Sequence, residues 1–454
     1  MERAPGRSAP HFGPGSFAWR LAGQYLPLAA LALATVLILR NLAGGEDALS
    51  APPASVAPNH IERLEANINF FETRVLEIDD SLSYNRLTGL YLQRVRETGD
   101  VSDIARAERS ATRSLAVFPG DYAGLVNLAL VRIAQHDFRA AAEIASRARA
   151  ARPLKPDAYA LLGDARAALG DYDGATENYR VFLEKAPGFS AFSRQAALAE
   201  TRGKLALAEQ FWLAAIDSDA TDVPENSAWA RVQLAHFYFF TGRIAESGDQ
   251  YHAALQAYPG YIHALAGLAR LAATHGDDND AITLSRRATA NVPVPEYVGA
   301  LGDVYARARN PSAAAGQFAI IDAIRQLFDA GGVRSDLTLI LFAADHGANT
   351  AEMVERAGAA YAGRPSIAAA DVYAWALYRA GRFDEAATLA AEALRVGTED
   401  PNFFFHAGMI AAARGEAAAA RAWLQRALAL NPNFSVVYAT TAREALDRLR
   451  EDGR

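Results

Sequence analysis

The longest uninterrupted hydrophobic stretch of the chain lies near its N-terminus. Residues 21–39 (LAGQYLPLAALALATVLIL) contain no charged side chain, and their number matches the ~20 apolar residues that a helix needs to cross a bilayer. Arg residues precede this run and acidic residues follow it, so the positive-inside rule leaves the N-terminus in the cytoplasm. We expect a disordered cytoplasmic tail at 1–20, one transmembrane helix at 21–40 and a flexible linker at 41–59.

The same run allows two other interpretations, a cleaved signal peptide and a buried helix of a globular domain. In a signal peptide, cleavage would follow a small residue such as Ala43 or Ala57. Arg40 lies close to the first site and Pro58 directly follows the second, which makes both unfavourable and favours the anchor. A mature N-terminus near residue 44 or 58 would exclude it.

Beyond the linker, apolar residues alternate spacings of three and four, which is a heptad-like pattern on one helix. We expect an amphipathic helix at 60–87 that caps the N-terminal end of the following array. The alternative is a short coiled coil, through which two chains would self-associate weakly over 61–82. The apolar positions are Ile61, Leu64, Ile68, Phe71, Val75, Ile78 and Leu82.

From residue 88 onward, the pattern of apolar, small and turn residues recurs with a fixed period. Intervals of 34 residues separate Pro119, Pro153 and Pro187, and likewise Gly347, Gly381 and Gly415. A period of this length is typical of a repeated helix–turn–helix unit.

The segment 156–187 shows the logic of one unit. A first helix carries Gly163 on its core face, a turn follows at Gly170, and a second helix carries Ala175 and Tyr179 on one face. Small residues at 163 and 175 lie where the helices cross, so that the two backbones can approach closely. A large side chain there would overpack the crossing.

These positions resemble the tetratricopeptide repeat, whose pattern is W-x2-L-G-x2-Y, then A-x3-F and then P. The resemblance implies an all-α, right-handed superhelix (an α-solenoid) of about ten repeats over 88–434, with first helices lining a concave groove. A last helix within 435–454 would cover the apolar end of the stack. The unit from Val333 departs from the pattern, because Ile340 and Glu352 occupy its small positions. The repeats are expected to start at Thr88, Tyr122, Pro156, Phe189, Ala228, Ile262, Pro295, Val333, Ile367 and Pro401.

Composition supports a helical fold and excludes several kinds of chemistry. Hydrophobic residues make up 51% of the chain and Ala alone about a fifth, and Ala is the best helix former. The sequence contains no Cys, which excludes disulfides, thiol catalysis and cysteine-bound metals. With 45 basic and 52 acidic residues, the net charge of −7 argues against a nucleic-acid partner.

The sequence carries no catalytic or cofactor-binding motif, so we expect neither enzyme activity nor a cofactor or metal. The pairs His136-Asp137 and Asp345-His346 fall at turns, where solvated turns or helix caps are expected. The acidic group at 217–225 lacks the Gly and Glu of an EF-hand loop, and that at 277–280 suits a helix N-terminus. A pocket with a buried His and two carboxylates would instead favour an enzyme.

The concave groove implied by the resemblance is the expected binding surface. Aromatic and Arg side chains dominate binding hot spots, because they bury large areas and form directed hydrogen bonds. By register, such residues beside the core face of the first helices should point into the groove; the alternative is that the aromatic side chains pack between repeats. The candidate partner-binding residues are Arg194, Trp229, His236, Phe239, Arg270, Arg307, Asp371, Trp375, Tyr378, Phe405 and Met409.

The layout as a whole resembles that of bacterial membrane-anchored tetratricopeptide proteins. That resemblance implies a non-catalytic, single-pass scaffold in the cytoplasmic (inner) membrane, with its repeats in the periplasm. We expect the groove to hold a protein or peptide partner in envelope assembly or secretion. The alternative is a polysaccharide-export or assembly subunit that contacts glycan or a glycan-modifying enzyme, since aromatic residues with acidic neighbours also suit sugars.

Overall fold

The computed structural model describes residues 58–98, 102–219, 224–290, 292–330, 336–347 and 350–451. These residues form 22 α-helices, α3 to α24, and no strand. None of the helices in this part of the chain is long and apolar enough to cross a bilayer. The expected tail (1–20) and transmembrane helix (21–40) lie outside it, as does the linker (41–59) apart from Pro58 and Asn59, which belong to α3 (Pro58–Glu77).

Between α3 and the last helix, α24 (Tyr438–Glu451), the helices form ten consecutive pairs, as the repeat pattern predicts. Seven of the ten expected starts agree with the first helix of a pair to within a residue. The pairs are α4 (Ser81–Thr98) with α5 (Ser102–Val117), α6 (Tyr122–Ala134) with α7 (Phe138–Ala151), α8 (Asp157–Ala168) with α9 (Tyr172–Lys185), α10 (Phe189–Thr201) with α11 (Leu205–Asp217), α12 (Pro224–Phe240) with α13 (Ile244–Ala257), α14 (Ile262–His275) with α15 (Asp278–Thr289), α16 (Pro295–Arg307) with α17 (Pro311–Ala330), α18 (Leu337–Asp345) with α19 (Thr350–Gly363), α20 (Ile367–Arg379) with α21 (Phe383–Ala393), and α22 (Pro401–Ala413) with α23 (Ala417–Leu430).

The turns inside the pairs follow from local chemistry. Asp137, Asp171 and Asp277 each stand directly before a second helix, and each side chain accepts the backbone N–H three residues later. A carboxylate at this position satisfies a free N–H and complements the helix dipole. The turn and cap interpretation of His136-Asp137 and of 277–280 is therefore confirmed.

The close crossing of the paired helices is also confirmed. A Cβ atom added at Gly163 would lie 2.2 Å from the ring of Tyr179, and one added at Gly302 would lie 2.3 Å from the ring of Phe318. Each ring therefore fills the space that the missing side chain leaves, and a larger residue on the first helix would push the second helix away.

Three boundaries differ from the sequence-based expectation. The helix expected at 60–87 is two helices, because Asp80 accepts hydrogen bonds from the backbone N–H and the hydroxyl of Ser83 and so starts α4 at Ser81. Leu64 and Ile68 of α3 are buried in a cluster with residues of α4 and α5, which leaves Leu82 64% exposed. In addition, α12 begins at Pro224 rather than Ala228, and α18 begins at Leu337 rather than Val333.

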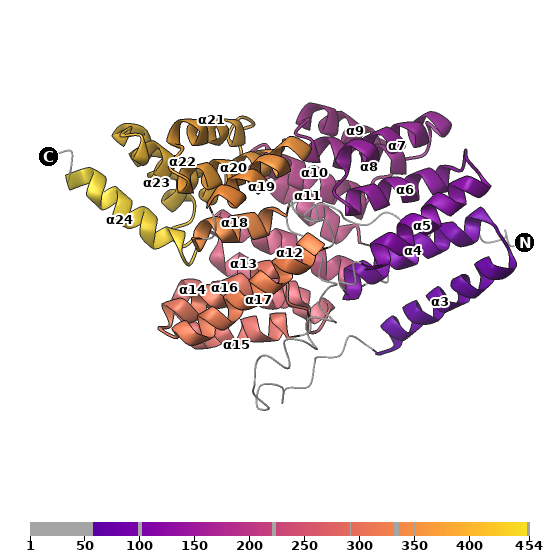
Figure 1. The fold of residues 1–454 in the computed structure, drawn as a ribbon, viewed down its shortest axis with the longest axis horizontal. Helices are drawn as coiled ribbons and strands as arrows, with labels where there is room; N and C mark the ends of the chain where they lie inside the picture. Colours follow the sequence, from indigo (N-terminus) through magenta and orange to yellow (C-terminus); the bar gives the residue numbers. More distant parts are fainter. Residues whose placement is uncertain are drawn as a thin grey trace, which may run out of the picture.

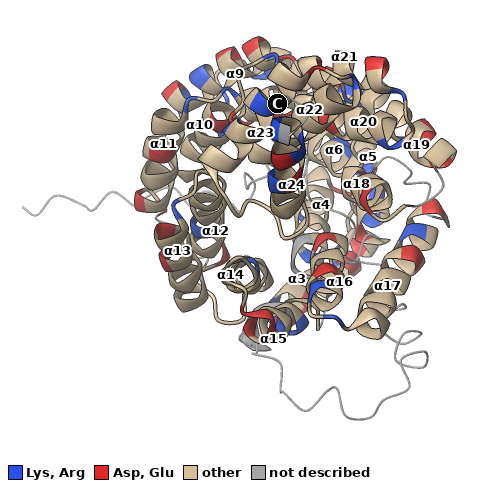
Figure 2. Ribbon diagram, turned by 90° about the vertical axis from the view of Figure 1, so that its left-hand side faces the viewer, with Lys and Arg blue, Asp and Glu red and all other residues tan. Residues whose placement is uncertain are grey.

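The pairs wind into a ring (Figures 1 and 2). In Figure 2, the second helices α11, α13, α15, α17 and α19 lie at the periphery, and the first helices α12, α14, α16 and α18 face the axis. We call the surface that these first helices turn toward the axis the inner face.

The ring closes on itself, because the C-terminal pairs pack directly on pairs that precede them by about 190 residues. The hydroxyl of Tyr172 accepts a hydrogen bond from the backbone N–H of Ile367 at 2.9 Å, and the side-chain amide of Asn431 donates to the carbonyl of Phe239 at 2.7 Å. The core cluster that contains residues of α20 and α22 also includes Tyr172 and Tyr179 of α9. We call this contact between the two superhelical turns the seam.

Three turn glycines make the seam tight. Gly170, Gly203 and Gly242 all have positive φ, and a Cβ atom at each would lie 2.0–2.5 Å from a backbone carbonyl oxygen of the other turn. The acceptors they face are the carbonyl oxygens of Pro365, Gly397 and Leu430. A side chain at any of the three turns would therefore hold the two turns apart.

Candidate functional site

The strongest candidate site lies on the inner face of α12, α14 and α16, where several predicted groove residues come together. Arg270 of α14 projects over the rings of Phe239 and Phe240 of α12, at 4.2 and 5.3 Å from its guanidinium carbon to the ring centroids. Its Nη2 donates to the hydroxyl of Tyr251 at 2.7 Å. We call this group, together with the residues introduced below, the Arg270 site.

The repeat pattern itself builds this site. Gly267 occupies the small position of α14, and a Cβ atom there would lie 2.2 Å from the ring of Tyr251. The missing side chain lets Tyr251 of α13 cross to the first helix, where its hydroxyl reaches Arg270. His263 lies two helical turns before Arg270, so both project toward the inner face.

Arg270 differs from Arg194 in its surroundings. Within the described residues, no acidic oxygen lies within 4.0 Å of its guanidinium, and its buried Nε has no hydrogen-bond partner. The guanidinium of Arg194, by contrast, is bound by both oxygens of Asp164 at 2.8 Å. A half-buried guanidinium that is stacked but not neutralised is suited to receive an anionic group.

Burial shifts the pKa of several titratable groups near Arg270. Burial, with the charges of Arg270 and His263, lowers the pKa of His236 well below its usual value, and burial lowers the pKa of His263 to about 4. Burial raises the pKa of Glu296, against the opposing effect of Arg270. The imidazole of His263 is neutral at pH 7 and shares a 2.5 Å hydrogen bond with the hydroxyl of Tyr297.

Other predicted groove residues are used inside the fold. Arg194 is 3% exposed and joins α10 to Asp164 of α8, while Arg307 is exposed and pairs with Asp278 of the preceding repeat. Trp229 is partly buried against Trp212 and Phe189, between neighbouring repeats. Whether any of them also contacts a partner stays a prediction.

The remaining candidates gather around α20 and α22. Trp375 and Phe405 are 4% and 1% exposed, Tyr378 stacks on Trp375 at 4.7 Å between ring centroids, and Met409 packs partly buried against the same core. Asp371, 4% exposed, accepts a hydrogen bond from His406. These side chains pack between repeats in the described structure, which is the alternative that the sequence left open.

Asp345 is the one carboxylate of the two His-Asp pairs that does not act as a solvated turn residue. It accepts hydrogen bonds from the indole N–H of Trp375 at 2.8 Å and from the hydroxyl of Tyr438 at 2.5 Å. A buried His406 thus lies near two carboxylates, Asp345 and Asp371, but aromatic rings surround it. It lines neither of the two cavities described next.

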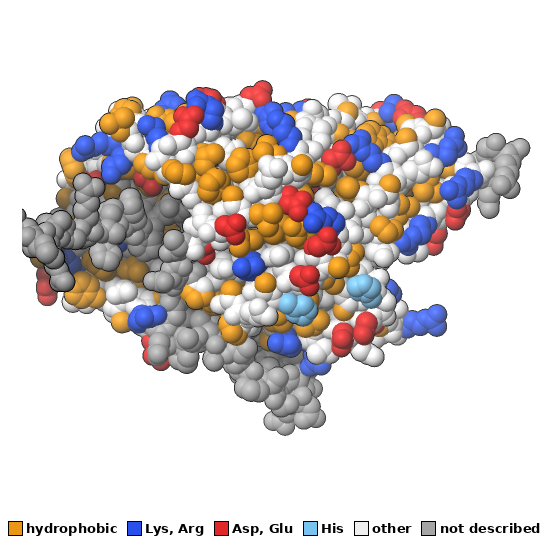
Figure 3. Space-filling model, turned by 180° about the vertical axis from the view of Figure 1, so that it is seen from behind, with side chains coloured by type: hydrophobic (Ala, Val, Ile, Leu, Met, Phe, Trp, Pro, Cys, Tyr) orange, Lys and Arg blue, Asp and Glu red, His pale blue; other side chains and the backbone are white. Residues whose placement is uncertain are grey.

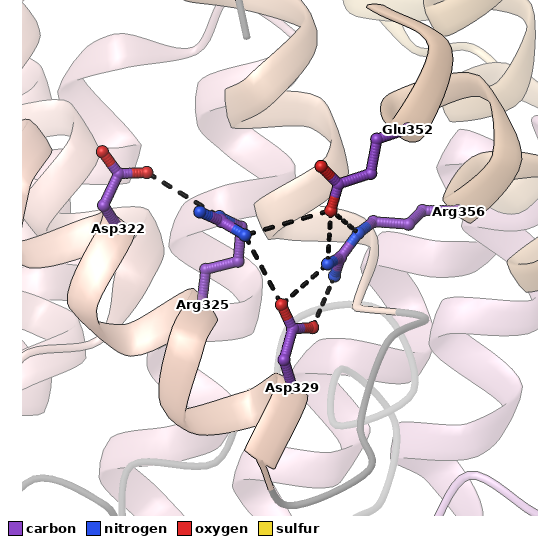
Figure 4. A network of polar contacts seen from close by, with 5 residues as sticks. All are labelled: Asp322, Arg325, Asp329, Glu352 and Arg356. Atoms are coloured by element: carbon purple, nitrogen blue, oxygen red, sulfur yellow. Dashed lines mark hydrogen bonds and ion pairs between the residues drawn. The ribbon is translucent and has the colours of Figure 1, made fainter. Parts of the chain in front are cut away.

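The irregular repeat α18–α19 opens a cavity of about 300 Å³ beside α17. An ionic network lies at its edge (Figure 4): Arg356 binds Asp329 at 2.7 Å and Glu352 at 2.6 Å, and Arg325 lies 3.4–3.9 Å from acidic oxygens of Asp322, Asp329 and Glu352. Glu352 stands at a position that is small in other repeats, and it pairs with Arg356 one turn later in α19. The cavity lining includes Phe318, Ile321, Leu339, Ile340, Phe342 and Met353.

A second cavity, of about 200 Å³, lies in the seam. It is lined by Tyr172 and Glu200 from one turn and by Arg364 and Asp400 from the other. Within the described part of the chain, no three His, Asp or Glu residues are arranged to hold a metal ion. Over the face seen in Figure 3, side chains of both charges alternate with hydrophobic ones across the described residues.

The sequence did not single out Tyr251, His263, Glu296, Tyr297 or His406. The seven-residue spacing of His263 and Arg270 on one face of α14 would have indicated that His263 belongs to the Arg270 site. For His406, the only sequence signal is a His inside an otherwise apolar first helix, FFFHAGMI.

A match to a protein-family model agrees with this repeat architecture. The model of the tetratricopeptide repeat family matches residues 126–190 and 374–433. Among curated proteins, none matches the chain significantly. Among solved structures, the chain is similar to PilW, described as a type IV pilus biogenesis factor (18% identity over 44% of this chain and 91% of PilW, TM-score 0.38). It is also similar to yeast Tom70, with 12% identity over 92% of this chain and 96% of Tom70 and a TM-score of 0.37. A tetratricopeptide repeat protein from Parabacteroides merdae is similar with 17% identity over 58% of this chain and 98% of that protein, at a TM-score of 0.33.

Proposed function

We propose that this chain, of which residues 126–190 and 374–433 match the tetratricopeptide repeat model, is a non-catalytic scaffold that binds an extended segment of a protein partner on the inner face of its ring. The observation that carries this proposal is Arg270, which is stacked on Phe239 and Phe240 yet has no carboxylate within 4.0 Å among the described residues. A carboxylate of the partner would supply the missing counter-ion. Phe239 is fully buried and supports the guanidinium from the core, whereas Phe240 is partly exposed beside it. An accessible aromatic ring beside a guanidinium is a combination that concentrates binding energy.

The surroundings of Arg270 favour an acidic side chain over a neutral one. His263 is neutral at pH 7, and burial disfavours the charged form of Glu296. The phenol of Tyr251 already holds the guanidinium in position, so little side-chain freedom is lost on binding.

We further propose that residues 21–40 anchor this scaffold in a bacterial cytoplasmic membrane, with the repeats in the periplasm. The support is the uncharged apolar run at 21–39 and the Arg residues before it. An anchor confines the scaffold and its partner to the membrane surface, which raises their effective concentration. Deletion of 21–40 should move the protein from the membrane fraction to the soluble fraction, and a mature N-terminus near residue 44 or 58 would contradict the anchor.

A displayed library of random short peptides tests the binding proposal on the full chain in detergent. We expect enrichment of peptides with Asp or Glu, and loss of that enrichment in Arg270→Gln. The matched control is Arg243→Gln, which removes the same charge from a side chain already paired with Glu209 and Glu246. Enriched peptides without acidic residues would contradict the role of Arg270, and binding of glycans with no peptide binding would instead support the glycan-contacting alternative.

A further inference from the structure

A buried polar cluster joins the C-terminal helix to three first helices of the ring. It consists of Asp345 at the end of α18, Asp371 and Trp375 on α20, His406 on α22 and Tyr438 at the start of α24; we call it the His406 cluster. Nδ1 of His406 lies 2.9 and 3.0 Å from the two carboxylate oxygens of Asp371. The imidazole stacks on Trp375 at 4.3 Å and meets Tyr438 edge-on at 5.4 Å.

The cluster holds more negative than positive charge when His406 is neutral. His406 is 1% exposed, and its Nε2 is buried without a hydrogen-bond partner among the described residues. The acidic groups that face it are Asp371 from α20, Asp345 from α18 and Asp400 at the start of α22, and Tyr438 is the titratable group that α24 contributes. Buried carboxylates require compensation by a cation or by hydrogen bonds.

Among the described helices of the cluster, α24 is the one that does not belong to a repeat. The other four side chains belong to α18, α20 and α22, each of which is packed within a helix pair. Tyr438 contributes a hydroxyl to Asp345 and a ring stacked on Phe405 at 4.6 Å, while Ala442 and Leu446 of α24 are buried in the same core cluster. Tyr438 is thus the polar contact between α24 and the His406 cluster.

The segment before α24 also takes part in closing the ring. Asn431, fully buried, donates its side-chain amide to the carbonyl of Phe239 at 2.7 Å, and the carbonyl of the preceding Leu430 abuts Gly242. Phe434 is 2% exposed within the same core cluster as Tyr438. Movement of α24 would therefore disturb the seam contact between Asn431 and the carbonyl of Phe239.

We infer that α24 is a proton-operated latch: protonated His406, paired with Asp371, holds Tyr438 on Asp345 and keeps the C-terminal end of the ring closed, and loss of the proton releases α24 and loosens the seam at Asn431. Protonation makes the His406–Asp371 pair neutral and leaves the two hydrogen-bond donors Trp375 and Tyr438 to Asp345. Without the proton, two carboxylates remain buried around an uncharged ring.

The electrostatics of the cluster agree with this inference. Burial disfavours the charged imidazole, yet the charge and hydrogen bond of Asp371, with the charges of Asp345 and Asp400, raise the pKa of His406 overall. A His whose folded pKa is raised stabilises the fold below its unfolded pKa, and this stabilisation is lost as the pH rises through the folded pKa. The latch therefore holds in mildly acidic solution and opens in alkaline solution.

Hydrogen exchange of the full chain, read peptide by peptide at about pH 6 and about pH 8.5 and corrected for intrinsic rates, tests the latch. We expect protection of 438–451 and of 431–437 to fall several-fold at the higher pH, while α6 to α9 keep theirs. His406→Gln should show low protection of α24 at both pH values, and His252→Gln, an exposed His of α13 outside the cluster, should behave as wild type. Equal protection of 438–451 at both pH values in the wild type would overturn the latch, as would an equal pH-dependent loss over all repeats.

The variant Asp371→Asn distinguishes a proton switch from a purely structural contact. It also provides the test if His406→Gln does not fold. The amide keeps a hydrogen-bond partner for His406 but removes the negative charge that favours its protonation. We expect the pH at which α24 loses protection to move lower. A uniform loss of protection with an unchanged midpoint would show that the cluster only packs, which would overturn the proposal.

Discussion

The seam predicts that chemically identical glycine substitutions will have unequal effects. Gly203 and Gly381 occupy the same turn of their repeats and both have positive φ, at 64° and 75°. A Cβ atom at Gly203 would lie 2.0 Å from the carbonyl oxygen of Gly397, whereas one at Gly381 would have no atom within 4 Å. Ala at the two positions therefore differs in one respect, the contact with the other superhelical turn.

The expected magnitudes follow from two effects. An L-residue in the left-handed conformation costs about 1–2 kcal/mol, which applies to both variants. Atoms in van der Waals contact lie roughly 3.5 Å apart, so the Gly397 loop must also move by roughly 1.5 Å in Gly203→Ala. Overpacking of this kind costs a further ~1–3 kcal/mol. We expect about 1–2 kcal/mol of destabilisation for Gly381→Ala and about 2–5 kcal/mol for Gly203→Ala.

Two measurements check this prediction. The first is the denaturation midpoint by circular dichroism, compared between the variants because a long repeat array need not unfold in two states. The second is the distance between spin labels at Glu177→Cys in α9 and Glu385→Cys in α21, which the absence of natural Cys makes straightforward. We expect a longer or broader distance for Gly203→Ala only. Equal midpoints and equal distance distributions for the two variants would refute the seam as a tight backbone contact.

Three further substitutions test other parts of the structure. Arg309→Gly should raise the thermal midpoint, because Arg309 is exposed and its φ of 59° strains the backbone of a non-glycine residue. Relief of this strain, minus the entropy cost of a more flexible unfolded chain, gives about 0.5–1 kcal/mol of stabilisation. An unchanged or lower midpoint would contradict this. Asp164→Asn should destabilise the chain by about 3–5 kcal/mol, because it leaves the buried guanidinium of Arg194 without a counter-ion, and the double variant Asp164→Leu/Arg194→Met should recover much of the loss in the same melting assay. His263→Asn should flatten the pH dependence of stability between pH 7 and pH 5. The pKa of His263 in the folded chain, about 4, lies below that in the unfolded chain, so the unfolded chain takes up the proton first as the pH falls. The wild type therefore loses up to about 2 kcal/mol of stability from this group over that range. The same loss in the variant would exclude His263 as its cause.

Much of the repeat could be predicted because its determinants are local. The starts at Tyr122, Ile262 and Pro401 agree with the structure, since a small residue at each crossing and a turn residue between helices are enough to specify a pair. The irregular unit was foreseeable from Glu352, which cannot occupy a close crossing and pairs with Arg356 instead. The break at 78–80 was missed, because the apolar spacing continues across it and Asp80 caps the next helix.

The candidate site was predicted only in part, for a different reason. Register placed His236 and Arg270 on the inner face, but it did not show that Tyr251 would reach Arg270 from the second helix through the space at Gly267. Nor could it show that Arg194 would be neutralised by Asp164 while Arg270 would not. Such differences depend on which side chains of neighbouring repeats meet, and the repeat pattern is the same in both cases.

The sequence by itself determined the period, the helix pairs and the small residues at their crossings, because each of these depends on residues within one unit or its neighbour. The tertiary structure decided where the ring closes. Glycines recur at equivalent turns along the chain, yet Gly170, Gly203 and Gly242 meet the other turn while Gly276, Gly347, Gly381 and Gly415 have no atom near. Closure depends on small rotations between successive units that add up over some 190 residues, and no local pattern records their sum.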